Sequence, residues 1–239
     1  MRKNLSIASL AAGLLSLLLA APGHALGINE SINIDADSQA DGASTVNGSI
    51  TVGSGATVTG DLETVNGSIR IKENAVIENA ETVNGSVKVG SGVKAEDISS
   101  VNGAIRIGEK VTIKGEVSVV NGKIGIASGS TISEDVSNVN GEIKITGAEI
   151  GGDLSTVNGD VSLDEGAFLH GNLTIEKPGG WDKNKSRKPK IIIGPGSRIG
   201  GKIVAEREIE LYISDTAEGG GVAGVMSMEQ AVRFSGKRP

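Results

Sequence analysis

The chain has 239 residues, including 36 glycines, no cysteine and 2% aromatic residues, and its formal net charge is −6. The absence of cysteine excludes disulfide bonds and thiolate metal sites. Aromatic side chains normally provide much of the bulk of a globular core, so their scarcity excludes a conventional one. The glycines follow no Gly-X-Y period that would indicate collagen.

The first 25 residues have the charged, apolar and small-residue regions of a secretory signal peptide, ending at Ala25. Cleavage there removes two of the 23 basic residues and none of the 29 acidic ones, so the net charge falls from −6 to about −8. A membrane anchor is the alternative, but the apolar run is short and no stop-transfer charges follow it. We therefore expect an exported protein, periplasmic or at the cell surface, with no transmembrane segment after cleavage.

The tripeptide Val-Asn-Gly occurs seven times from Val46 onward, at intervals of 18 or 19 residues. A nearly constant period of this size indicates a stacked repeat. In the first repeat, apolar or small residues recur at Val46, Ile50, Val52, Ala56, Val58, Leu62 and Val65. Steps of two place alternate side chains of a strand on one face, and longer steps turn corners. The sequence predicts an all-β fold, a three-sided parallel β-solenoid (β-helix) of nine or ten coils of 18–19 residues, and the pattern fits either handedness.

Asn-Gly between apolar runs is also a hairpin signal. A two-residue hairpin would place Val46 and Ile50 on opposite faces and leave no core, so the solenoid is favoured. At its corner we expect Val to point inward, Asn to accept a left-handed backbone conformation and Gly to leave space. The asparagines would then form a column that exchanges amide hydrogen bonds. The expected column consists of Asn47, Asn66, Asn84, Asn102, Asn121, Asn140 and Asn158.

Two other interpretations of this corner are weaker. Some units match the N-glycosylation pattern, but the corner explains the residues without a glycan. Outward columns of Thr and Asn around an inward Val would resemble the flat face of ice-binding solenoids. Val119 and Asn138 interrupt the Thr column, however, and the neighbouring Gly favours a bend.

The chain divides into five segments. These are a signal peptide (1–25), regular coils (26–175), a basic excursion loop around Trp181 (176–190), terminal coils (191–216) and a C-terminal cap or tail (217–239). An eighteen-residue, Gly-rich, three-strand coil with Val, Ile and Ala inside resembles the bactofilins, a polymer-forming family of the bacterial cytoskeleton. The resemblance covers roughly residues 28–213 and implies end-to-end polymerisation without nucleotide. Bactofilins are cytoplasmic, so the signal peptide makes this chain an exported variant of the pattern.

Catalytic, cofactor and metal sites are not expected. After cleavage His170 is the only histidine, and no partner lies near it in sequence. Paired carboxylates recur along one side of the coils, but glycan-cleaving solenoids also present aromatic residues to sugars, and this chain has few. The calcium-binding Gly-Gly-x-Gly-x-Asp repeat is missing as well. We predict a protein that is not an enzyme.

Basic residues suggest two contact surfaces. Five residues after the repeat Val, an outward column carries Arg70, Lys88, Arg106 and Lys144. The excursion loop carries Trp181, Lys183, Lys185, Arg187 and Lys188. Both could contact an anionic glycan, lipid headgroups or another envelope surface, although a solvated face and a solvated loop explain the same residues. The acidic net charge and the export signal argue against nucleic acid.

The expected function is that of a structural envelope protein that self-associates end to end into oligomers or polymers, since an uncovered coil is an unpaired β edge. Ile28 and Val232 lie near the predicted ends. The alternative is a monomeric binding protein that uses the basic column or the Trp181 loop.

Overall fold

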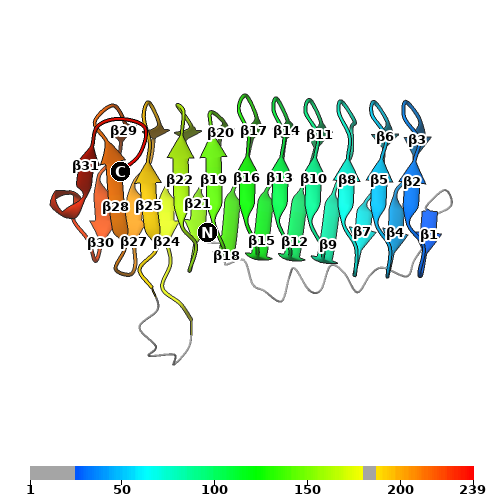
Figure 1. Ribbon diagram of the computed structural model, residues 1–239, viewed down its shortest axis with the longest axis horizontal. Coiled ribbons are helices and arrows are strands. Elements are labelled where there is room, and N and C mark those ends of the chain that lie inside the picture. Colours follow the sequence, from blue (N-terminus) through cyan, green and yellow to red (C-terminus); the bar gives the residue numbers. More distant parts are fainter. Residues whose placement is uncertain (1–24, 180–186) are drawn as a thin grey trace.

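The computed structural model describes residues 25–179 and 187–239, and these form a single parallel β-solenoid (Figure 1). Within this part of the chain, two walls are sheets of 11 strands each and the third wall is built of shorter strands. The prediction of an all-β, three-sided parallel solenoid is confirmed. The coil number is about eleven rather than nine or ten, and the last coil lies within residues 217–239.

Each wall takes one strand from each coil. Sheet A consists of β1 (Ala25–Gly27), β4 (Ala43–Thr45), β7 (Leu62–Thr64), β9 (Ala80–Asn84), β12 (Ile98–Asn102), β15 (Val117–Asn121), β18 (Val136–Asn140), β21 (Leu154–Thr156), β24 (Leu173–Ile175), β27 (Ile203–Ala205) and β30 (Val222–Gly224). Sheet B consists of β2 (Ile32–Ile34), β5 (Ile50–Val52), β8 (Ile69–Ile71), β10 (Val87–Val89), β13 (Ile105–Ile107), β16 (Ile124–Ile126), β19 (Ile143–Thr146), β22 (Val161–Asp164), β25 (Lys190–Ile193), β28 (Glu210–Ser214) and β31 (Val232–Phe234).

Sheet C is the narrow wall. It consists of β3 (Gln39–Ala40), β6 (Thr57–Val58), β11 (Lys94–Ala95), β14 (Thr112–Ile113), β17 (Thr131–Ile132), β20 (Glu149–Ile150), β23 (Phe168–Leu169), β26 (Arg198–Ile199) and β29 (Glu218–Gly219). Val76 bridges β6 to β11 through its pairings with Thr57 and Lys94, so the wall continues through that coil. The chain runs from sheet A to sheet B to sheet C in successive coils (Figure 1), and the last coil ends after its sheet B strand, β31.

Register explains the core. Ile69, Val87, Ile105 and Ile124 are consecutive partners in sheet B, and all four side chains are buried. The residue between two inward positions of a strand, such as Arg106, faces solvent. Alternation of this kind in every wall gives a thin core of Ile, Val, Leu and Ala without aromatic rings.

The corner between sheets A and B corrects the predicted orientation of the repeat valine. Val65 and Val83 are only partly buried, whereas the preceding Thr64 and Thr82 are buried at 0% and 1% exposure. Each threonine hydroxyl donates a hydrogen bond to a glycine carbonyl of the previous coil, with Thr82 Oγ1 lying 2.9 Å from the oxygen of Gly67. The threonine therefore points inward and the valine outward, the reverse of the expected arrangement.

The corner glycine is needed for space. A Cβ placed on Gly85 would lie 1.8 Å from the carbonyl oxygen of Gly67, and one on Gly103 would lie 1.8 Å from that of Gly85. Neither of these residues is among the described glycines with positive φ. Consecutive corners approach too closely for any side chain at this position.

The repeat asparagines form the predicted column of side-chain hydrogen bonds. Asn102 Nδ2 donates to Asn84 Oδ1 at 3.0 Å, and Asn121 Nδ2 donates to Asn102 Oδ1 at 3.0 Å. The same contact recurs from Asn47 to Asn158, and at the N-terminal end it continues to Asn29. None of the repeat asparagines is among the described residues with positive φ, so the expected left-handed conformation is wrong.

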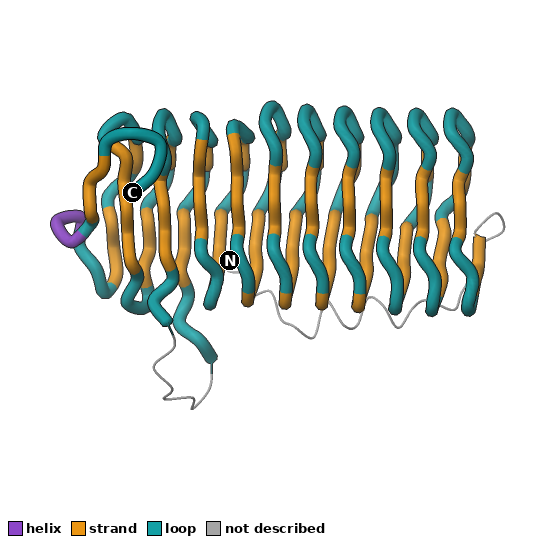
Figure 2. Tube along the Cα trace, in the orientation of Figure 1, coloured by secondary structure: helices purple, strands orange, loops and turns teal. Residues whose placement is uncertain are grey.

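Left-handed residues lie instead at the corner between sheets B and C, where the turns stack along one edge (Figure 2). Gly55, Gly92 and Gly129 have φ values of 69°, 71° and 70°, and the equivalent residues of intervening coils are Asn74 at 58° and Lys110 at 56°. They occur nine residues after the repeat valine. The Cβ of either residue is crowded there, but the short polar side chain of Asn can hydrogen-bond locally, so Asn tolerates this conformation better than Lys.

Replacing Lys110 with glycine is therefore expected to stabilise the solenoid. Relief of the left-handed strain contributes about 1–2 kcal/mol, and the greater backbone freedom of glycine in the unfolded chain offsets about 0.5–1 kcal/mol of it. Thermal unfolding followed by circular dichroism should show a higher melting temperature for K110G and a smaller change for N74G. An unchanged or lower melting temperature for K110G would contradict the assignment.

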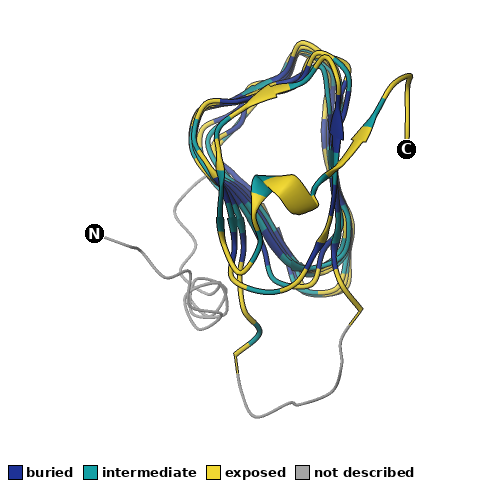
Figure 3. Cartoon of the chain, turned by 90° about the vertical axis from the view of Figure 1, so that its left-hand side faces the viewer, coloured by how far each residue is buried: buried dark blue, intermediate teal, exposed yellow. Residues whose placement is uncertain are grey.

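The two ends of the solenoid differ. At the C-terminal end, the 3-10 helix η2 (Met228–Gln230) lies across the opening (Figure 3), and Met226, Met228 and Ala231 pack against the core. In the first described coil, Leu26 and Ile28 are 58% and 73% exposed. Its strands pair only with the following coil among the described residues.

Candidate functional site

The strongest candidate site is the outer face of sheet B. Arg70, Lys88 and Arg106 occupy the middle of consecutive strands β8, β10 and β13 and are direct partners in the parallel register. All three side chains are exposed. Since neighbouring strands of a sheet lie about 4.8 Å apart, three positive charges follow one another in single file along the solenoid axis.

Gly125 interrupts this column. It pairs with Arg106 on one side and with Lys144 on the other, and no atom lies within 4 Å of where its Cβ would be. The missing side chain leaves an open hollow of about 530 Å³ between the two cations. Lys123 and Glu142 line one side of the hollow, at the corner with sheet A.

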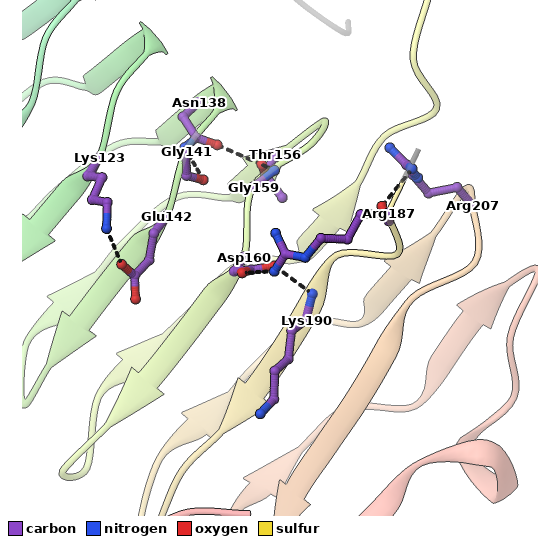
Figure 4. Close-up of polar contacts among 10 residues, drawn as sticks. All are labelled: Lys123, Asn138, Gly141, Glu142, Thr156, Gly159, Asp160, Arg187, Lys190 and Arg207. Atoms are coloured by element: carbon purple, nitrogen blue, oxygen red, sulfur yellow. Dashed lines mark hydrogen bonds and ion pairs between the residues drawn. The ribbon is translucent and has the colours of Figure 1, made fainter. Parts of the chain in front are cut away.

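Some other exposed cations in the described part of the chain are paired with carboxylates. Lys114 lies 2.7 Å from Glu96, and Lys123 lies 3.1 Å from Glu142 (Figure 4). Within residues 25–179 and 187–239, no ion pair is formed by Arg70, Lys88, Arg106 or Lys144. The carboxylates nearest to the column, such as Glu109 and Glu142, therefore lie beyond ion-pair distance of its four cations.

The excursion loop replaces the Asn-Gly corner of its coil. Leu173 pairs with Ile203 across 30 residues, whereas the coils before it are 18 or 19 residues long. Its far end is held by Asp160, which accepts a hydrogen bond from the backbone amide of Lys190 at 2.8 Å and forms an ion pair with Arg187 (Figure 4). Lys188 lies 2.9 Å from Glu208, and the hydrogen bond and charge of Lys188 lower the pKa of that carboxyl.

These ion pairs change the expected role of the loop. Arg187 and Lys188 bind carboxylates of the protein itself, so their charges are already compensated. Trp181, Lys183 and Lys185 lie outside the described residues. Among the described residues, no ion pair or hydrogen bond joins Arg187 or Lys188 to the cations of the sheet B column.

Arg207 ends the asparagine ladder. Its guanidinium donates hydrogen bonds to Asn158 Oδ1 at 2.7 Å and to the carbonyl oxygen of Val157 at 3.0 Å. A further bond of 3.3 Å joins it to the carbonyl oxygen of Arg187 (Figure 4). Arg207 therefore spans the coil in which the excursion loop has displaced the asparagine.

Carboxylates along the corner between sheets C and A are structural. Asp97 Oδ1 accepts a hydrogen bond of 2.7 Å from the backbone amide of Glu116. Asp135 Oδ1 accepts one of 2.7 Å from the backbone amide of Asp153. On the outer face of sheet A, Glu81 is a direct partner of Glu63. Burial raises the pKa of the Glu81 carboxyl, and the charges of Glu63 and nearby carboxylates raise it further.

His170 is less isolated than the sequence indicated. Its Nε2 lies 2.5 Å from Glu149 Oε1, and its ring lies 3.9 Å from that of Phe168 on sheet C. The side chain of His170 remains 42% exposed. Neither residue of the pair lines the hollow over Gly125.

Three features of the site region escaped sequence reasoning. The threonine hydroxyls are polar and were assigned to the surface, Arg207 lies 49 residues from its partner Asn158, and Gly125 has no charge that would single it out in the basic column. Gly125 carried the one usable signal, because an outward strand glycine marks a place where another chain can approach.

Comparisons with protein-family models, curated proteins and solved structures give no significant match. Among the described residues, no helix has the length and hydrophobicity required to cross a bilayer. The same residues contain no cluster of three or more His, Asp or Glu side chains placed to hold a metal ion.

Proposed function

We propose that the protein is a non-enzymatic structural β-solenoid of the bacterial cell envelope that self-associates through its first coil. The observation that carries this proposal is the difference between the two ends. The core at the C-terminal end packs against Met226, Met228 and Ala231, whereas the first coil pairs only with the following coil among the described residues and carries exposed Leu26 and Ile28 on its outer surface. An open coil offers both unpaired backbone groups and apolar surface to a second molecule.

The proposed export fits this arrangement. Cleavage after Ala25 would begin the mature chain inside β1 and leave Leu26 and Gly27 as its remaining strand residues. End-to-end association is also what the resemblance to bactofilins implies. Covering of the C-terminal end by η2 favours pairing of N-terminal coils over indefinite growth.

Charged substitutions in the first coil are expected to prevent association. The double variant L26K/I28K places two cations on the exposed edge, where lysine blocks strand addition in natural sheets. Light scattering of residues 26–239 across a concentration series should show a mass that doubles for the unmodified chain and stays monomeric for the variant.

The matched control is V232K, because Val232 is 52% exposed at the covered C-terminal end. Its behaviour should match that of the unmodified chain. Filaments that lengthen with concentration in negative-stain electron microscopy would mean that the C-terminal end also joins. A monomer at every concentration would contradict self-association.

A further inference from the structure

The shape of the charged surface on sheet B restricts what it can bind. Arg70, Lys88, Arg106 and Lys144 lie in one line along the axis, one residue per coil except at Gly125. Carboxylates border this line on both sides, with Lys72, Lys110 and Lys123 among them. Glu73, Glu109 and Glu165 are exposed at the corner with sheet C, and Glu142 lies at the corner with sheet A.

A broad anionic surface such as a membrane would meet these bordering carboxylates as well as the cations. A narrow chain with repeated negative charges could follow the line and avoid them. The large exposed apolar residues described are Leu26, Ile28, Val76, Val225 and Val232, and none of them lies in a strand that carries the column. The arrangement therefore favours a linear polyanion.

The hollow over Gly125 adds a place for a bulky unit of such a chain. Its volume of about 530 Å³ falls within the range of small-ligand sites, about 300–1,000 Å³. Arg106 and Lys144 flank it, and the Lys123–Glu142 pair supplies a further donor and acceptor at its edge. Groups of this kind suit a ring that carries both a carboxylate and hydroxyls.

We propose that the outer face of sheet B binds a linear acidic polysaccharide that lies along the solenoid axis. Arg70, Lys88, Arg106 and Lys144 contact its carboxylates, and one sugar ring occupies the hollow over Gly125. Binding at this wall does not depend on self-association at the first coil, because the two surfaces are separate.

The test uses oligogalacturonates of defined length, titrated into residues 26–239 by isothermal calorimetry. The variant R70Q/K88Q/R106Q should bind roughly tenfold more weakly, since an exposed ion pair contributes roughly 1.5- to 5-fold each. Added salt should weaken binding of the unmodified chain. The variant G125L fills the hollow without changing the net charge and should also lose affinity.

The matched control K94Q/K114Q/K202Q removes the same charge from other faces and should retain affinity. If both triple variants lost affinity equally, net charge alone would explain the binding, and the proposal would be overturned. So would the absence of oligogalacturonate binding, or equally tight binding of oligothymidylate or of phosphatidylglycerol vesicles. Retained affinity in G125L would overturn the assignment of a ring to the hollow.

Discussion

Alanine at Gly85 is expected to destabilise the solenoid by about 3 kcal/mol or more, which is a large effect for the addition of one methyl group. The new Cβ would lie 1.8 Å from the carbonyl oxygen of Gly67. That oxygen also accepts the hydrogen bond of Thr82, so it cannot move away without a further loss. Urea unfolding of G85A, with hydrogen exchange to locate the affected coils, measures the effect.

The matched control is G125A. The Cβ of that alanine would have no neighbour within 4 Å, and the residue lies in strand β16. Alanine there should raise the free energy of unfolding by about 0.5 kcal/mol, since glycine is unfavourable inside a strand. If G85A and G125A had similar stabilities, close approach of the corners could not be the reason for the repeat glycine.

The strand pattern was predictable because burial and alternation are local properties. From Ile50 to Leu62, every position assigned to the interior is buried. At the corner, the polar threonine was assigned to the surface and the apolar valine to the interior, and both assignments were wrong. Alternation from Leu62 leads to Thr64, which is buried, whereas hydrophobicity alone selects Val65. The hydroxyl of Thr64 can be buried because it donates a hydrogen bond of 2.8 Å to the carbonyl oxygen of Gly48 in the previous coil.

The asparagine ladder was predictable from spacing, since residues one period apart must stack. Its terminus at Arg207 was not, because the excursion loop breaks the period before that residue. The basic column followed from spacing in the same way. The hollow over Gly125 depends on how neighbouring side chains leave space, which spacing does not describe.

Valine at Thr82 is expected to destabilise the protein by about 1–3 kcal/mol, because it leaves the carbonyl oxygen of Gly67 without its buried donor while shape is preserved. Val119 occupies the equivalent position in β15 and cannot donate. The reverse substitution V119T is therefore expected to stabilise by about 0.5–1.5 kcal/mol through a new bond to the oxygen of Gly103. Urea unfolding of both variants measures the two effects.

The pair of variants separates hydrogen bonding from packing. If the inward hydroxyls mattered only for volume, T82V would equal the unmodified chain and V119T would bring no gain, since valine and threonine have nearly the same shape. Opposite changes of stability would show that each coil is tied to the previous one by a side chain as well as by the backbone. Ser100, which lacks the methyl group, makes the same contact with Gly85 at 3.0 Å, so the hydroxyl is the shared feature of the column.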